Sequence, residues 1–317
     1  MKIGLIGYGV MGRNHARIVA SDDRHELIGI HDLRFSSDEG AIFKRSVGEL
    51  IESGMQACIL SVPPNQTKKL ALSLAEYRIP TLIEKPLSDS YRGATEITAA
   101  FHKTETFASV GYIERFNQAV LKAKELIISG DLGKVLEISS IRLGYLGNRS
   151  PIFGVELDLL VHDLDLIKFL TEKRIIKSKA IRTSFIQKGI SDTVTVVGLL
   201  EDNTHFSIRA NWISPFKKRE FAITGERGTL VINTLDMGVR LYMNGTVESY
   251  WDELTSIRGV TQGNEINFAL TRKEPLKMQF ESFILGIQGV ETHSASLTEA
   301  SNLLSDLEKF FYQESEI

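Results

Sequence analysis

The chain has 317 residues, of which 43% are hydrophobic and 24% are charged. This length suits about two domains with separate cores, and the composition is that of a globular protein, which excludes disordered and fibrous classes. The formal net charge of −3 leaves no global basic field that would gather phosphate backbones. We therefore expect no nucleic-acid partner.

The single cysteine, Cys58, excludes an internal disulfide and a four-thiolate metal site within one chain, which fits a reducing, cytoplasmic setting. The longest apolar runs are far shorter than the ~20 residues of a membrane helix. The first residues, MKIGLIGYGVMG, carry no signal-peptide pattern. We expect a cytoplasmic protein with no membrane partner and no resident metal.

Strand and helix patterns alternate from residue 1 to about residue 113. Apolar runs predict strands at Lys2–Ile6, Glu26–His31, Gln56–Val62, Thr81–Glu84 and Phe107–Tyr112. Helical spacing falls between them, at about Met11–Ala20, Asn65–Tyr77 and Ser88–Lys103. This alternation predicts an α/β Rossmann domain, a doubly wound parallel sheet, over residues 1–113.

Strands dominate the next part of the chain, residues 114–276. Helices are expected only at Asn117–Ser129 and Asp158–Leu170. Strands are expected at Lys134–Gly144, Ile175–Gln187, Thr193–Leu200, Thr204–Trp212, Arg219–Thr224, Gly228–Asn233, Val239–Tyr242 and Thr246–Tyr250. They predict an α+β domain with a large open, mostly antiparallel sheet for substrate binding and oligomerisation. Residues 277–317 are expected to form helices, Lys277–Gly289 and Leu297–Gln313, that pack back on the Rossmann domain.

The glycines Gly7, Gly9 and Gly12 lie between the first strand and the first helix, where bare backbone can approach a pyrophosphate. Asp32 ends the next strand, 20 residues after Gly12, and a carboxylate there accepts hydrogen bonds from the adenosine ribose. This pattern predicts NAD as cofactor. Arg34 keeps NADP possible, because a guanidinium can pair with a 2′-phosphate. The alternative is a tight turn next to an ordinary acid.

Lys85, in the run Glu84-Lys85-Pro86, follows a strand at the carboxyl edge of the predicted parallel sheet, where α/β proteins bind ligands. Proline restricts the residue before it to extended backbone, which gives the ammonium group a defined direction. Lys85 is therefore a candidate catalytic residue beside a nicotinamide. The alternative is a solvated Lys-Pro turn.

Three titratable residues recur at helical spacing in the expected helix Asp158–Leu170: Asp158, His162 and Asp165. Their spacing of i, i+4 and i+7 predicts one helix face. A nearby carboxylate can orient an imidazole that takes a hydroxyl proton as general base. Two alternatives stay open, a buried histidine satisfied by its neighbour and a metal site.

The order and spacing of these motifs resemble the Gfo/Idh/MocA oxidoreductases over nearly the whole chain. The resemblance rests on the glycine loop with Asp32, Ser61–Asn65, Glu84-Lys85-Pro86, Gly111–Asn117 and Asp158–Asp165. It implies NAD(P)-dependent oxidation or reduction of a sugar or cyclitol carbinol, with Lys85, His162 and Asp158 as catalytic residues. Two residues differ from those usual in the family, Gln118 in place of proline and Thr67 in place of histidine. Both differences bear on how the substrate is bound.

The runs Gly111–Val120 and Asn211–Arg219 are most similar to the UDP-N-acetylglucosamine 3-dehydrogenases within that family. The similarity implies hydride transfer between C3 of a UDP-N-acetylhexosamine and nicotinamide. The first alternative is an inositol, polyol or free-aldose dehydrogenase, and the second is a non-catalytic dinucleotide-sensing regulator. The similarity also implies a homodimer or homotetramer formed through the second sheet. The expected cofactor contacts are Gly7, Tyr8, Gly9, Val10, Met11, Gly12, Asp32, Leu33, Ser61, Pro63, Asn65, Glu84 and Lys85. The expected substrate contacts are Tyr112, Arg115, Asn117, Arg149 and Trp212, with Arg142 and Lys217–Arg219 as further cations for a diphosphate.

Overall fold

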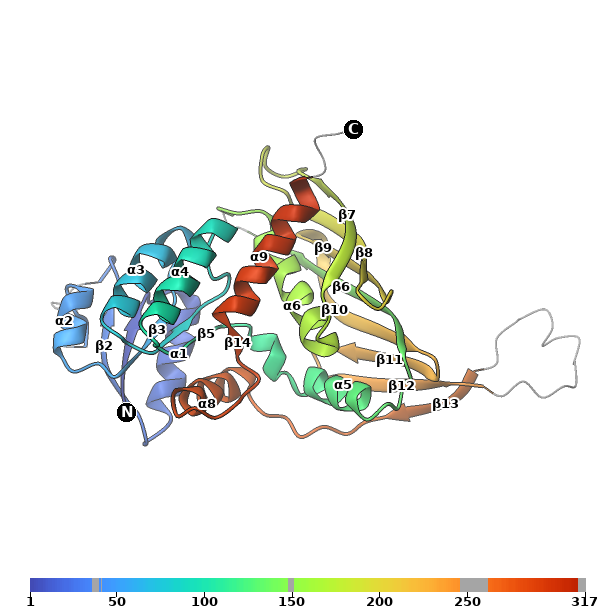
Figure 1. Cartoon of the computed structure of the whole chain (residues 1–317), viewed down its shortest axis with the longest axis horizontal. Helices are drawn as coiled ribbons and strands as arrows, with labels where there is room; N and C mark the ends of the chain where they lie inside the picture. The colour runs from blue at the N-terminus through green and yellow to red at the C-terminus, as the bar shows by residue number, and fades with distance from the viewer. Residues whose placement is uncertain (36–39, 41, 148–150, 246–261, 313–317) are drawn as a thin grey trace, which may run out of the picture. The chain divides into compact units, whose positions relative to one another are not determined.

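A computed structural model describes residues 1–35, 40, 42–147, 151–245 and 262–312 of the chain (Figure 1). The chain divides into two compact units. The first comprises Met1–Phe116 and Glu274–Lys309, and the second comprises Asn117–Lys273 and Phe310–Ile317. The C-terminal segment that begins at Glu274 therefore returns to the first unit, and each unit is described by itself below.

The first unit is built on a six-stranded sheet with the strand order β14-β5-β4-β3-β1-β2. Its strands are β1 (Lys2–Ile6), β2 (Glu26–His31), β3 (Ala57–Leu60), β4 (Thr81–Ile83), β5 (Ala108–Val110) and β14 (Ala295–Ser296). Strands β1 to β5 run parallel, and β14 pairs antiparallel with β5. The prediction of a parallel Rossmann sheet is confirmed.

Helices pack on this sheet through apolar side chains. The helices of the unit are α1 (Val10–Ala20), α2 (Val47–Glu52), α3 (Pro64–Glu76), α4 (Tyr91–Lys103), the short 3₁₀ helix η2 (Ile113–Phe116), α8 (Pro275–Ile287) and most of α9 (Leu297–Tyr312). Ile18 of α1 and Phe280 and Phe283 of α8 share one buried cluster with Ile3 and Leu5 of β1. Helices α3 and α4 lie side by side (Figure 1).

Strand β1 has β2 on one side and β3 on the other. The strand order therefore reverses at β1, because β2 is added toward one edge of the sheet and β3 to β5 toward the other. Such a switch point opens a crevice beyond the carboxyl ends of the strands, and ligands of open α/β sheets bind there. The fold therefore places the loops after β1, β2 and β3 around a ready-made binding position.

The second unit contains an eight-stranded sheet with the order β13-β12-β11-β10-β6-β9-β8-β7. Its strands are β6 (Val135–Tyr145), β7 (Ile175–Thr183), β8 (Thr193–Leu200), β9 (His205–Asn211), β10 (Ile213–Gly225), β11 (Gly228–Asn233), β12 (Gly238–Asn244) and β13 (Gln262–Asn267). Among the described strand pairs of this eight-stranded sheet, only β6–β9 is parallel. The prediction of a mostly antiparallel sheet is confirmed, while the expected strand Thr246–Tyr250 lies outside the described residues.

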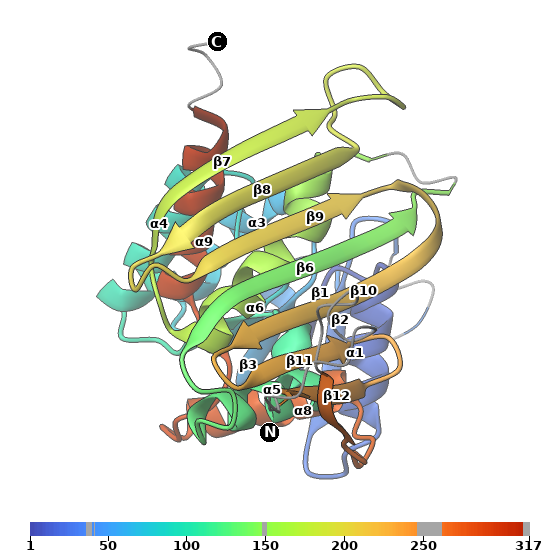
Figure 2. The same cartoon turned by 90° about the vertical axis from the view of Figure 1, so that its right-hand side faces the viewer.

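Helices α5 (Gln118–Ile128) and α6 (Val161–Thr171) lie against one face of this sheet, behind it in Figure 2. Ile138, Ile208 and Phe221 point to that face and are buried. The other face turns toward the viewer in Figure 2, and no helix of the unit covers it in the described ranges. Small side chains such as Ser139, Ala222 and Val231 pair across this second face.

Arg142 of β6 is buried and bonded to a carboxylate, in place of the diphosphate contact expected from the sequence. Its Nε lies 2.6 Å from Oδ1 of Asp163 on α6, and both side chains are 1% exposed. The alternation of β6 turns Arg142 to the helix-covered face together with Ile138. This guanidinium therefore neutralises a buried acid beneath α6.

Removing one member of this pair is expected to destabilise the strand-rich unit. Asp163→Leu removes the carboxylate that Nε of the buried Arg142 contacts, and breaking a buried ion pair costs about 3–5 kcal/mol, whereas the double variant Arg142→Met with Asp163→Leu costs much less. Urea unfolding followed by tryptophan fluorescence checks this, because Trp212 belongs to this unit. A double variant as unstable as the single one would contradict the ion-pair account.

Candidate functional site

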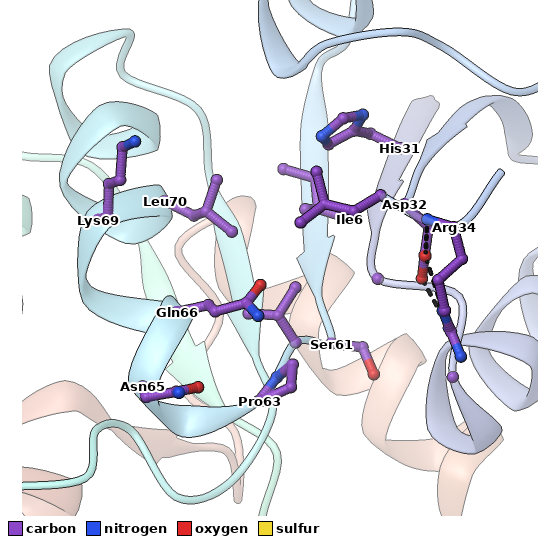
Figure 3. Close-up of a pocket in the computed structure, with 14 residues that line it drawn as sticks. Ile6, His31, Asp32, Arg34, Ser61, Pro63, Asn65, Gln66, Lys69 and Leu70 are labelled. Carbon is purple, nitrogen blue, oxygen red and sulfur yellow. Dashed lines mark hydrogen bonds and ion pairs between the residues drawn. The ribbon is translucent and has the colours of Figure 1, made fainter. Parts of the chain in front are cut away.

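A cavity of about 780 Å³ lies at the switch point of the first unit, beyond the carboxyl ends of β1, β2 and β3. Figure 3 shows Asp32 and Arg34 on one wall and residues of α3, including Gln66 and Lys69, on the opposite one. The full lining is Ile6, Gly7, Gly9, His31, Asp32, Leu33, Arg34, Ser61, Val62, Pro63, Asn65, Gln66, Lys69 and Leu70. The position and the lining suit an extended dinucleotide.

The glycines fit such a ligand for separate reasons. A Cβ on Gly12 would lie 2.0 Å from the carbonyl oxygen of Gly7, so helix α1 approaches the strand too closely for any side chain. A Cβ on Gly9 would meet nothing within 4 Å, so this backbone is open. Gly9 is also the N-cap of α1, and no side chain caps the helix. Uncapped N–H groups at a helix start bind phosphate oxygens, so these residues fit the diphosphate of NAD.

Asp32 stands at the end of β2 with both carboxylate oxygens occupied. Oδ1 accepts Nε of Arg34 at 2.9 Å, and Oδ2 accepts Nη2 of Arg34 at 2.8 Å and the backbone N–H of Tyr8 at 2.6 Å. The Arg34 guanidinium holds the pKa of the Asp32 carboxyl well below its usual range. Asp32 is therefore ionised at neutral pH, as an acceptor for ribose hydroxyls must be.

Seven of the expected cofactor contacts line the cavity: Gly7, Gly9, Asp32, Leu33, Ser61, Pro63 and Asn65. The others, Tyr8, Val10, Met11, Gly12, Glu84 and Lys85, are not in its lining. The Tyr8 ring packs edge-on against Phe35 and Phe43, with centroids 5.8 and 5.6 Å away. Gln66, Lys69 and Leu70 line the cavity without being among the expected contacts, although their one-turn spacing after the Ser61–Asn65 loop is a usable signal.

Asp32 and Arg34 are expected to affect the two dinucleotides differently. Asp32→Ala should weaken NAD binding about 10–100-fold, since a hydrogen bond to a charged group contributes about 1.5–3 kcal/mol. NADP should lose less, because its 2′-phosphate is repelled by this carboxylate. Arg34→Ala should weaken NADP and leave NAD little changed. Fluorescence titrations with NADH and NADPH give the four Kd values, and equal losses of both dinucleotides in Asp32→Ala would remove Asp32 from the ribose site.

Lys85 follows β4 at the same edge of the sheet, and its peptide bond to Pro86 is cis. Its backbone N–H donates to Oε2 of Glu84 at 3.2 Å. The other oxygen of Glu84 lies 2.7 Å from Nε2 of His15, and the Glu84 side chain is 10% exposed. Glu84 is thus engaged within the protein, and its contact with cofactor stays a prediction, as does the catalytic role of Lys85.

In the second unit, Asp158 lies in a π-helical turn, Glu156–Leu160, just before α6 carries His162. A π-turn bonds five residues back instead of four, so the α-helical i, i+4 spacing expected for this pair does not describe it. Oδ2 of Asp158 accepts the indole N–H of Trp212 at 3.2 Å. His162 is partly exposed, whereas Asp165 is 1% exposed. Single π-turns occur frequently at functional sites.

The expected substrate contacts are mostly buried. Tyr112 is 1%, Arg115 3%, Asn117 4% and Trp212 2% exposed. Arg115 pairs with Glu299 at 3.1 Å, and Asn117 caps α5 by accepting the N–H of Ala119 at 3.0 Å. Arg149 lies outside the described residues. These contacts hold the fold together locally, and a substrate role for these side chains stays a prediction.

Within the described ranges, no group of three or more His, Cys, Asp and Glu side chains could hold a metal ion. No described helix is both long enough and apolar enough to cross a membrane. Cys58 is buried in β3, and burial raises the pKa of its thiol.

Family models match both parts of the chain. One, described as an oxidoreductase family with an NAD-binding Rossmann fold, covers residues 1–112, and the C-terminal domain model of GFO/IDH/MocA covers residues 120–231. The chain belongs to the GFO/IDH/MocA oxidoreductase family. The family assignment, the oxidoreductase class and NAD as cofactor are thereby confirmed.

Relatives within this family carry names of sugar and polyol enzymes. The chain is 25% identical to an inositol 2-dehydrogenase of Rhodococcus erythropolis, over 75% of this chain and 73% of that protein. It is 28% identical to a glucose-6-phosphate 3-dehydrogenase of Bacillus subtilis, over 54% of each. The matched region spans 54% to 76% of the length of the curated relatives.

Among solved structures, the fold is shared with the UDP-N-acetylglucosamine 3-dehydrogenase GnnA from Acidithiobacillus ferrooxidans. The TM-score is 0.83 at 20% sequence identity, and the match covers 98% of this chain and 96% of that one. A levoglucosan dehydrogenase in complex with NADH also gives a TM-score of 0.83, at 16% identity. These likenesses concern the fold.

Proposed function

We propose that the protein oxidises a ring carbinol of a sugar, the 3-hydroxyl of a UDP-N-acetylhexosamine, with NAD as hydride acceptor. The observation that carries the proposal lies in the first unit. Lys85 follows β4 on the same sheet edge where β1, β2 and β3 end around a cavity that fits a dinucleotide. An ammonium group beside such a cavity suits work on an oxygen that gains or loses a proton.

Oxidation of the carbinol group removes two hydrogens, the carbon-bound one as hydride and the hydroxyl one as a proton, and each needs its own acceptor. The glycine loop and Asp32 would hold NAD, which would supply an acceptor for the carbon-bound hydrogen as hydride. His162 is proposed to take the hydroxyl proton as general base, and Lys85 is proposed to hydrogen-bond an oxygen that gains carbonyl character. Asp158, held by the indole N–H of Trp212, is the carboxylate proposed to support His162.

The nucleotide-sugar substrate is supported by the motif runs Gly111–Val120 and Asn211–Arg219 and by exposed groups suited to a nucleoside diphosphate. Tyr145 is 67% and Phe216 57% exposed, and Lys217 is exposed beside Phe216. Lys218 is paired with Glu220 at 3.1 Å, which leaves it less suited to a phosphate. An inositol, polyol or free aldose is the second candidate, favoured by the names of the curated relatives.

The decisive experiment is a screen of NAD reduction across UDP-sugars, free sugars and inositols, together with thermal shifts in UDP. Turnover of a UDP-N-acetylhexosamine and a raised Tm in UDP are expected, since a free-sugar enzyme has no site for UDP. Turnover of an inositol with no UDP shift would replace the proposed substrate by a polyol. Tight NAD binding without turnover of any of these compounds would favour a dinucleotide-sensing regulator.

We also propose that the helix-free face of the eight-stranded sheet pairs with a second copy of the chain, giving a homodimer or a homotetramer. The proposal is supported by Ser139, Ala222 and Val231, which pair across neighbouring strands on this face, because side chains of this size allow another sheet to approach closely. Sedimentation should find a dimer or tetramer, and Ala222→Arg should reduce its mass while circular dichroism stays unchanged. A monomeric unaltered chain would contradict the proposal.

A cytoplasmic setting is proposed on the single cysteine, Cys58, which needs no oxidising compartment. Cell fractionation with a marker for each compartment tests it, and recovery in an exported fraction would overturn it.

A further inference from the structure

A buried imidazole lies directly behind the Lys85 loop. His15 is on α1, one turn after Gly12, and its side chain is 0% exposed. Its Nε2 is 2.7 Å from Oε1 of Glu84, while Nδ1 has no hydrogen-bond partner among the described residues. A protonated Nδ1 would be an unsatisfied buried donor, which is costly. The bond therefore runs most simply from Nε2–H of His15 to the carboxylate.

Glu84 is held by two further hydrogen bonds. Its Oε2 accepts the backbone N–H of Lys85 at 3.2 Å, and its own backbone N–H donates to the carbonyl oxygen of Leu60 at 2.8 Å, which fixes the main chain that carries the carboxylate. A Cβ added to Gly111 would lie 3.0 to 3.1 Å from the carboxylate atoms, so the group fills the space beside that glycine. Segments from α1, β4 and the end of β5 thus converge on one carboxylate.

Stability alone does not account for this arrangement. A buried polar or charged pair is often no more stabilising than apolar residues of the same volume. Unlike an apolar pair, His15 and Glu84 fix the direction of the carboxylate oxygen that accepts the Lys85 backbone N–H. They also connect that N–H to α1, the helix that follows the glycine loop.

We propose that His15 and Glu84 form a positioning pair that sets the orientation of Lys85 relative to the glycine loop. His15 acts through Glu84, and Glu84 acts through the Lys85 backbone; neither has to touch the reacting oxygen. The inference rests on the proposed function in one respect, because it takes Lys85 as the group that acts on the substrate. The geometry of the pair itself is independent of the substrate's identity.

Two substitutions at His15 separate positioning from simple filling of space. Glutamine places an N–H donor where Nε2 of His15 lies, whereas leucine fills the volume without a donor. His15→Leu is expected to lower kcat about 100-fold, the size of effect that a small misplacement of a reacting group produces, with KM and the Kd for NAD little changed. His15→Gln is expected to restore most of kcat.

A second readout needs no turnover. The rate at which an amine-reactive acylating reagent modifies Lys85 is measured by mass spectrometry in the substrate-free protein. Lys69, an exposed lysine on α3 outside the pair, serves as the internal reference. His15→Leu is expected to change the Lys85-to-Lys69 labelling ratio, and His15→Gln is expected to bring it back toward the original value.

The two readouts distinguish failure of the positioning role from failure of the proposed function. An unchanged labelling ratio in His15→Leu, or equal losses of kcat in the leucine and glutamine variants, overturns the positioning role. If the unaltered protein turns over none of the screened substrates, the proposed function fails, while the labelling ratio still decides whether the pair orients Lys85. Should His15→Leu fail to fold, Glu84→Gln takes its place with the same expected fall in kcat and the same expected change in the labelling ratio.

Discussion

Replacing Lys85 by alanine is expected to reduce kcat about 10²–10⁴-fold, the contribution of a group that acts on a reacting oxygen. The Kd for NAD should change little, because the cavity beyond β1, β2 and β3 does not include Lys85 in its lining. Steady-state kinetics with the substrate found in the screen, together with an NADH titration, measure the two effects. The loss should appear in kcat more than in KM, since the interaction strengthens as the oxygen gains carbonyl character.

Lys69→Ala is the matched control for this experiment, because Lys69 is a lysine of the same unit that lines the cavity without following β4. It is expected to alter dinucleotide affinity at most and to leave the chemical step intact. Lys85→Arg keeps the positive charge but changes its shape, so it should stay well below the original activity. An unchanged kcat in Lys85→Ala would remove Lys85 from the mechanism.

The first unit was predictable because its signals are local. Gly7 to Gly12 lie between a strand and a helix within a dozen residues, and Asp32 ends the next strand, so the sequence alone indicates the loop and the acid beside it. The missed helix α2 also had a local signal. Ser46 accepts the N–H of Glu49 at 3.1 Å, and Glu49 accepts the N–H of Arg45 at 2.7 Å, close to the capping-box pattern.

In the second unit the strands were predictable from the sequence, whereas the side-chain contacts between distant residues were not. Arg142 and Asp163 are 21 residues apart, and Trp212 and Asp158 are 54 apart. No periodicity pairs such residues, because the pairing depends on which strands and helices meet in three dimensions. The π-turn at Glu156–Leu160 was hidden for a similar reason, since its sequence has the same apolar pattern as an α-helix.

The bond between His15 and Glu84 shows the same limit in the first unit. The two residues are 69 apart, and each looks ordinary alone, a histidine in a helix and an acid at a strand end. The parallel order of β1, β3 and β4 brings their segments to one edge. Strand order can be expected from the sequence, whereas the side chains that turn inward at this edge are set by three-dimensional packing.

Replacing His162 by asparagine is expected to lower kcat/KM about 10²–10⁴-fold in the oxidation direction and to flatten its dependence on pH. A histidine accepts a proton only as neutral imidazole, so oxidation catalysed through it accelerates as the pH rises through the range in which histidines titrate. Asparagine can still hydrogen-bond the hydroxyl, but it cannot take the proton. The variant should therefore lose the rise with pH as well as the rate.

His205→Asn is the matched control, because His205 lies on β9 of the same unit with an exposed side chain. It should leave both the rate and the pH profile as they are. The two histidine variants separate a specific base from a general effect of losing an imidazole. A His162→Asn protein whose profile kept its shape would mean that another group takes the proton, and His162 would then have a structural role at the start of α6.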